Sequence, residues 1–147
     1  MTMSWMNFVQ QAPELATFGA ERFKRSAGYL GTICKDGSPR VHPVTPILGK
    51  HLFLFMEPTS PKGKDLQRDP RYTLHCGVGD SSGGEGEFYV RGCAQLVQDS
   101  ELRAQAVEAA PYHPAEHYIL FVLSVECAVL NTYTNGKPNP RRWHPSA

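Results

Sequence analysis

The residues best suited to chemistry lie together in one short polar segment, Thr59-Ser60-Pro61-Lys62-Gly63-Lys64-Asp65-Leu66. Thr59 and Ser60 are good helix N-caps, and Pro61 suits the first helical position. Lys62 and Lys64 follow before the first apolar residue. The free backbone N–H groups of a helix start carry a partial positive charge, and they would converge here with hydroxyl and ammonium groups. The segment therefore predicts a phosphate-binding site.

A further cation comes from the strand-like segment that precedes this one. Residues 40–46 alternate as a strand does, residues 48–51 form a plausible tight turn, and residues 51–56 read as a second, nearly fully buried strand. Arg40 opens the first of these strands, and its planar guanidinium can hold two phosphate oxygens at once. The alternative interpretation of the same residues is a solvated, basic helix start between two strands.

Length and charge narrow the class of protein. The 147 residues predict a single domain spanning 1–147, and the formal net charge of +1 gives no sign of a nucleic-acid partner. No apolar run approaches the length of a membrane span, and the N-terminus lacks the pattern of a signal peptide. We therefore expect a soluble, cytoplasmic protein without a membrane or nucleic-acid partner.

Cysteine and histidine spacing argues against a metal site. The four cysteines are scattered through strand-like stretches without close pairs, at Cys34, Cys76, Cys93 and Cys127. Zinc sites and redox pairs usually show spacings such as C-x-x-C, so reduced, unpaired thiols are expected. His113 and His117 have helical spacing, but Pro114 separates them and no acidic third ligand stands out.

The elements that must position these residues follow from periodicity and turn signals. Helices are expected over residues 5–25 with a break at Pro13, 61–68 and 99–109; strands are expected over residues 29–34, 40–46, 51–56, 72–78, 88–97 and 118–133. Asp36-Gly37 and Asn135-Gly136 read as turns, Gly92 as a bulge or close approach, and the end of the chain as a basic, proline-rich tail. Strands joined by hairpin turns, with few helices, predict an antiparallel β-barrel with accessory helices, an α+β fold.

The order of these segments resembles the pyridoxamine 5'-phosphate oxidase-like, flavin-binding split-barrel family. Two motifs carry the resemblance, which extends from about residue 23 to residue 143. The first is G-x-P-R-x-x-P-V over residues 37–44, and the second is K-x-x-x-L-x-x-D-P-R over residues 62–71. The resemblance implies a six-stranded antiparallel split β-barrel that forms a homodimer, with FMN, or alternatively the deazaflavin coenzyme, between the two subunits.

The same resemblance assigns expected cofactor contacts by position. Arg40 and Lys62 match phosphate contacts, and Lys64 is a second possible phosphate partner. The strand along the flavin ring is matched by Val41, His42, Pro43, Val44 and Thr45. The strand end over the ribityl chain is matched by Phe55, Met56, Glu57, Thr59 and Ser60. A tail near the cofactor is matched by Trp143. The C-terminal Arg-x-His pattern of true pyridoxamine phosphate oxidases is missing, so vitamin B6 oxidation is not expected.

Three functions remain open from the sequence. One is an FMN-dependent oxidoreductase acting on a small organic substrate, in which the flavin supplies the hydride chemistry and no protein acid or base is required. Another is a protein that binds or stores a flavin, deazaflavin or haem without turnover. The third is a structural dimer with a vestigial site. No catalytic residue is assigned, and His42 and His75 read as packed strand histidines more readily than as proton donors.

Overall fold

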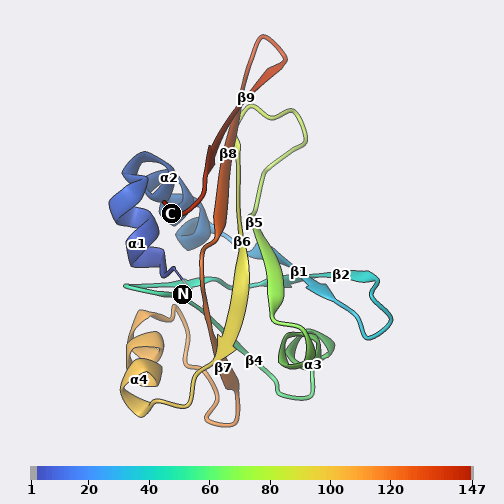
Figure 1. The fold of residues 1–147 in the computed structure, drawn as a ribbon, viewed down its shortest axis with the longest axis vertical. Coiled ribbons are helices and arrows are strands. Elements are labelled where there is room, and N and C mark those ends of the chain that lie inside the picture. Colours follow the sequence, from blue (N-terminus) through green and yellow to red (C-terminus); the bar gives the residue numbers. More distant parts are fainter. Residues whose placement is uncertain (1–2, 147) are drawn as a thin grey trace.

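The computed structural model describes residues 3–146, which form four helices and nine strands (Figure 1). The elements in chain order are α1 (Trp5–Gln11), α2 (Pro13–Arg25), β1 (Gly28–Ile33), β2 (Pro39–Val44), β3 (Ile47–Leu48), β4 (Leu52–Met56), α3 (Pro61–Arg68), β5 (Arg71–Cys76), β6 (Glu87–Leu96), α4 (Ser100–Ala109), β7 (Ile119–Leu123), β8 (Cys127–Thr134) and β9 (Lys137–Trp143). No helix within residues 3–146 is long and apolar enough to cross a membrane.

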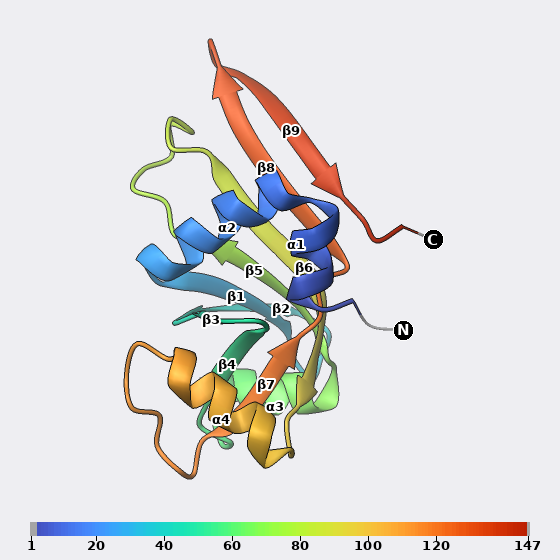
Figure 2. The ribbon, with the colours of Figure 1, turned by 90° about the vertical axis from the view of Figure 1, so that its left-hand side faces the viewer.

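The strands form one curled antiparallel sheet in the order β2-β1-β5-β6-β7-β4-β3, a half-barrel with accessory helices. Strand β8 pairs with β6 and β9 beside this path. Helices α1 and α2 lie over the part of the sheet that contains β6 and β8, whereas α3 and α4 lie toward its other end (Figure 2). The predicted α+β class and the antiparallel pairing are confirmed. Nine strands replace the expected six, because one predicted strand is divided and two segments were not predicted as strands.

The divided strand is the segment 118–133, which the alternation predicts as continuous. It separates into β7 and β8 at residues 124–126, where three residues face only Gly92 and Cys93 of β6. The amide of Ser124 still donates to the Cys93 carbonyl at 2.9 Å, so the chain follows β6 through a bulge. Gly92 allows this because a Cβ there would overlap the Ser124 carbonyl. The prediction of a bulge or close approach at Gly92 is confirmed, and the prediction of one continuous strand is wrong.

The basic, proline-rich end of the chain is also a strand. Residues 137–143 form β9 and pair with β8 across the turn at Asn135 and Gly136, whose φ angles are 53° and 75°. Pro138 and Pro140 are two residues apart, so both of the missing N–H groups fall on the same side of the strand. Because proline cannot donate to a ladder, that side is the edge away from β8, where no other strand of residues 3–146 pairs with β9.

Aromatic side chains join the N-terminal helices to the sheet. Phe8 of α1 and Phe88 of β6 are fully buried, with ring centroids 6.3 Å apart. The Trp143 ring lies 4.9 Å from Phe8, and a Cβ at Gly19 would overlap the Phe88 ring. These contacts place the main core between α1, α2 and the sheet. A smaller cluster around Phe53 lies beside α4.

The four cysteines are free thiols in the structure, and Cys76 and Cys127 are buried. We expect thiol counting of freshly made protein, under denaturing and non-reducing conditions, to return all four thiols, since none is paired in the folded chain. A lower count would show that two of them meet in a disulfide.

Candidate functional site

The predicted helix start is formed at α3. Ser60 is the N-cap, and its hydroxyl accepts a hydrogen bond from the Gly63 amide at 3.1 Å while donating to the Glu57 carbonyl at 2.7 Å. Gly63 lies against the end of β4, since a Cβ there would approach the Glu57 carbonyl to 2.8 Å. The predicted boundaries of the helix and its cap at Ser60 are confirmed. The Ser60 hydroxyl is occupied by capping, so its main role is to fix the helix start.

A buried carboxylate in α3 ties this helix to two strands. Asp65 is 3% exposed, and its Oδ2 accepts hydrogen bonds from the Thr32 hydroxyl and from Arg40 Nε, both at 2.7 Å. Arg68 donates to Oδ1 at 2.9 Å. Burial alone would raise the pKa of Asp65, but the hydrogen bonds from Thr32, Arg68 and Arg40 together lower it below its ordinary value. Asp65 therefore stays ionised and orients Arg40.

Arg40 and Lys62 remain available for an anion beside this carboxylate. Within residues 3–146, Arg40 has no partner other than Asp65, which takes its Nε and leaves both terminal nitrogens free. Lys62 precedes Asp65 by three residues and so lies on the same face of α3. Lys64 is exposed and, two residues further along, points to a different side of the helix. Helix spacing therefore places Lys62 on the side of α3 that carries Asp65, the partner of Arg40.

The predicted contacts from Val41 to Thr45 follow Arg40 along β2 and just beyond its end. In the described part of the chain, this strand pairs with β1 alone and lies at an edge of the sheet. Its side chains alternate: Val41, Pro43 and Thr45 are exposed, whereas His42 and Val44 are half-buried. Val41 is 66% exposed, the most among the exposed large apolar side chains of the described residues. Exposed positions and a free backbone edge leave β2 open to a flat ligand.

Four further predicted contacts differ in burial: three are buried, and one is exposed. Phe55 and Met56 are buried, so only their backbone could face a ligand, whereas Thr59 is exposed ahead of the helix. Trp143 is 9% exposed and packs against Phe8 in its own chain. The Trp143 indole thus has a structural role in the core.

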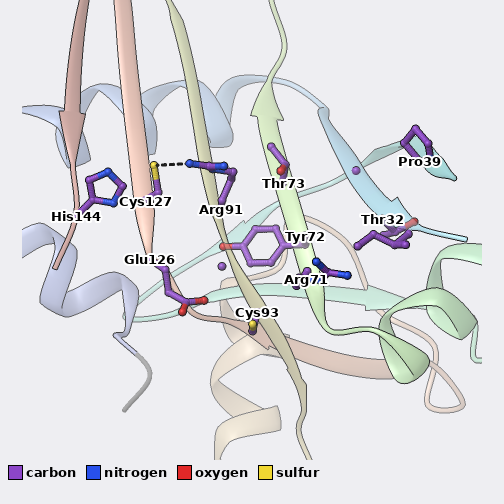
Figure 3. Close-up of a pocket in the computed structure, with 13 residues that line it drawn as sticks. Thr32, Pro39, Arg71, Tyr72, Thr73, Arg91, Cys93, Glu126, Cys127 and His144 are labelled. Carbon is purple, nitrogen blue, oxygen red and sulfur yellow. Dashed lines mark hydrogen bonds between the residues drawn. The ribbon is translucent and has the colours of Figure 1, made fainter. Parts of the chain in front are cut away.

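A groove that the sequence reasoning missed crosses the outer face of the sheet. Its volume is about 600 Å³, and it is lined by Gly31, Thr32, Ile33, Pro39, Arg71, Tyr72, Thr73, Arg91, Gly92, Cys93, Glu126, Cys127 and His144 (Figure 3). Thr32 also lines the groove, but its hydroxyl donates to Asp65. Because Thr32 follows Gly31 in β1, its side chain lies on the opposite face from the Gly31 side of the groove, so β1 separates the groove from the Arg40 cluster. Alternation along each strand could have marked the outward residues, but the register that aligns them is visible only in the fold.

The polar side chains of the groove differ in how far they are already paired. Arg71 binds Asp69 through two nitrogens, at 3.0 and 2.7 Å, and this pairing lowers the pKa of Asp69 to about 2. Burial, together with the nearby Glu126 carboxylate, raises the pKa of the Cys93 thiol, which disfavours a reactive thiolate. Within residues 3–146, no three His, Cys, Asp or Glu side chains cluster as metal ligands would.

Comparisons with known proteins bear on the family and the fold. The sequence model of a family described as "Pyridoxamine 5'-phosphate oxidase" matches residues 13–120. A search of curated proteins found no match. Similar solved structures include a heme binding protein from Mycobacterium smegmatis, at 22% identity and a TM-score of 0.69, with 87% of this chain and 56% of that one covered. This chain therefore spans little more than half the length of that protein.

Two further structures show the same fold at lower identity. One is General Stress Protein 26 from Bacillus anthracis str. Sterne, at 16% identity and a TM-score of 0.66, with 90% of this chain and 98% of that one covered. The other is described as an F420 reductase, at 16% identity and a TM-score of 0.57, with 74% and 93% covered. Similarity at this level of identity extends to the fold alone.

Proposed function

The chain belongs to the pyridoxamine 5'-phosphate oxidase family, and from this premise we propose that it is an FMN-dependent oxidoreductase acting on a small organic substrate. The observation that carries the proposal is the pairing of Arg40 with Asp65 beside Lys62. A buried carboxylate that holds one edge of a guanidinium and leaves the other edge free presents a preorganised phosphate contact. FMN carries such a phosphate, whereas riboflavin does not.

The residues present fit the rest of that cofactor. Lys62 and the backbone N–H groups at the start of α3 would complete the phosphate contacts, with Lys64 as a more distant cation. The residues from Val41 of β2 to Thr45, just after it, would lie along the ring, and the β4 end with Thr59 would lie along the ribityl chain. Bound FMN would supply the hydride chemistry. The chain's own residues would hold the phosphate, orient the ring and exclude water from one of its faces.

Binding without turnover is the second candidate function, and one observation favours haem as its ligand. His144 lines the groove, so its imidazole could bind the iron of a haem that lies over Arg91 and Thr73. The similar heme binding protein makes this candidate worth testing. The deazaflavin coenzyme F420 is the alternative phosphate-bearing ligand, as the similar F420 reductase suggests.

One experiment separates these functions. The purified protein is denatured, and the mass and absorbance spectrum of the released small molecule are measured. We expect the mass of FMN. Release of the deazaflavin coenzyme or of haem would identify that molecule as the ligand in place of FMN. Release of FMN from a protein that does not oxidise a nicotinamide donor would favour the binding function. A protein that neither contains nor takes up any of the three would contradict the proposal.

We expect the protein to be a homodimer in solution. Val41 of β2 and Tyr29 of β1 are 66% and 48% exposed on neighbouring strands. Two large apolar side chains exposed together at the edge of the sheet favour burial against a second copy of the chain. Light scattering at micromolar concentration should give twice the chain mass of 16.3 kDa. A clean monomer at that concentration would contradict this expectation.

A further inference from the structure

Four strands contribute one continuous row of residues to the floor of the groove. The register pairs Gly31 with Thr73, Thr73 with Arg91, and Arg91 with Cys127. All four residues line the groove, and Figure 3 shows Thr73, Arg91 and Cys127 on adjacent strands. Because paired residues of neighbouring strands project on the same face, this row forms a strip across the outer surface of the sheet. On its other side, Gly31 pairs with the exposed Val41 of β2, so the row continues to the edge of the sheet, and its cation, Arg91, lies toward β8.

Arg91 has unused hydrogen-bonding capacity. Its one side-chain contact within residues 3–146 is Nη2 to the Cys127 sulfur at 3.4 Å, and no carboxylate of the described chain pairs with it. A thiol is a weak acceptor, whereas a guanidinium presents five donors. Arg71 in the same groove is different, because two of its nitrogens are bound to Asp69. Arg91 is therefore the arginine of the groove that is free to receive an incoming carboxylate.

The part of the strip around Gly31 offers space for a flat apolar body. Gly31 has no side chain, and Ile33 and Pro39 give apolar walls beside it. A Cβ at Gly31 would approach no atom closer than 3.6 Å, so a larger side chain there would project into the groove without displacing the sheet. The volume of about 600 Å³ lies within the range of small-molecule pockets, roughly 300–1,000 Å³.

Charge sets the direction in which a ligand would lie. Glu126 lines the groove on the β8 side of Arg91, and its carboxylate accepts a hydrogen bond from the Ser124 hydroxyl at 3.3 Å. It repels an anion from that end. A ligand with one carboxylate would therefore place that group on Arg91 and its apolar body over Gly31.

We propose that this groove binds a small aromatic carboxylate, with Arg91 holding the carboxylate and Gly31 leaving room for the ring. The binding claim stands on the groove alone. One consequence rests on the proposed function: Val41, which the proposed flavin ring would contact, pairs with Gly31, so the bound carboxylate would lie next to the ring as its substrate.

The test uses 2-naphthoate and its neutral isostere 2-naphthamide, titrated calorimetrically into cofactor-free full-length protein. We expect 2-naphthoate to bind at least ten-fold more tightly than 2-naphthamide. Arg91→Gln should remove that preference by weakening 2-naphthoate alone, whereas Arg91→Lys should retain most of it. Gly31→Leu should weaken both compounds about ten-fold or more, because it fills the space for the ring.

Arg142→Gln is the matched control, since Arg142 is an exposed arginine on β9 outside the groove lining. It should bind both compounds as the parent does. Equal affinity for the two compounds, failure of 2-naphthoate to bind at millimolar concentration, or an unchanged affinity in either Arg91→Gln or Gly31→Leu would overturn the proposal. Titration of FMN into the same samples reports separately on the proposed function. Carboxylate binding without FMN binding would uphold the groove and reject the oxidoreductase.

Discussion

Lys62→Ala is expected to weaken FMN binding about ten- to a hundred-fold. A charge-assisted hydrogen bond contributes on the order of 1.5–3 kcal/mol, and this is the free energy that the variant loses when the ammonium no longer meets the phosphate. Lys62 has no ion-pair partner among the described residues, so its removal leaves no buried charge behind. The affinity can be measured from quenching of FMN fluorescence.

Two comparisons make this prediction specific. Lys64→Ala removes the same charge from the same helix, but Lys64 is exposed on a different side of α3, so we expect a clearly smaller loss. Riboflavin lacks the phosphate, and its affinity should change little in either variant. If Lys62→Ala binds FMN as the parent does while riboflavin affinity also stays constant, Lys62 is not a phosphate contact.

Local signals predicted the start of the candidate site well. Ser60, Pro61 and the Asp69-Pro70 stop fix α3 through neighbours in sequence, and the structure agrees with them at both ends. Capping and proline geometry act within one turn, so they can be read without knowledge of the fold.

The partner of Arg40 could not be read in the same way. Asp65 lies 25 residues from Arg40 and 33 from Thr32, and it reads in the sequence as an ordinary helix residue between Lys64 and Leu66. Only the register of β1 with β2 and the docking of α3 against β1 bring the three side chains together. The sequence predicts Arg40 as a phosphate contact, and this stays a prediction; Asp65, the group that orients Arg40, was not predicted.

The groove was missed for a related reason. Arg91 and Gly31 lie 60 positions apart, and their alignment needs two successive strand pairings. The prolines of β9 hid a further strand, because proline disfavours a strand unless its missing N–H faces a free edge. Which edge is free is a property of the completed sheet.

Asp65→Ala is expected to lower the free energy of unfolding by about 3 kcal/mol, the lower end of the range for breaking a buried charge pair. The variant leaves the Thr32 hydroxyl, Arg40 and Arg68 without their shared acceptor. The lower end applies because the two arginine side chains are 34% and 36% exposed and can recover water. Urea unfolding of cofactor-free protein measures the change without a contribution from ligand binding.

The pH dependence of that loss identifies its cause. The folded pKa of Asp65 is lowered from the ordinary value of 3.8, so its stabilising contribution is fully present above about pH 4 and is lost as the pH falls through the lower folded value. The difference in stability between the parent and Asp65→Ala should therefore be constant near neutral pH and shrink in acid. Asp69→Ala is the matched control. Asp69 pairs with Arg71, whose side chain is 70% exposed, so this variant should lower the free energy of unfolding far less. Equal losses from the two variants, or a difference between the parent and Asp65→Ala that persists unchanged in acid, would show that the buried carboxylate does not hold α3 to the sheet.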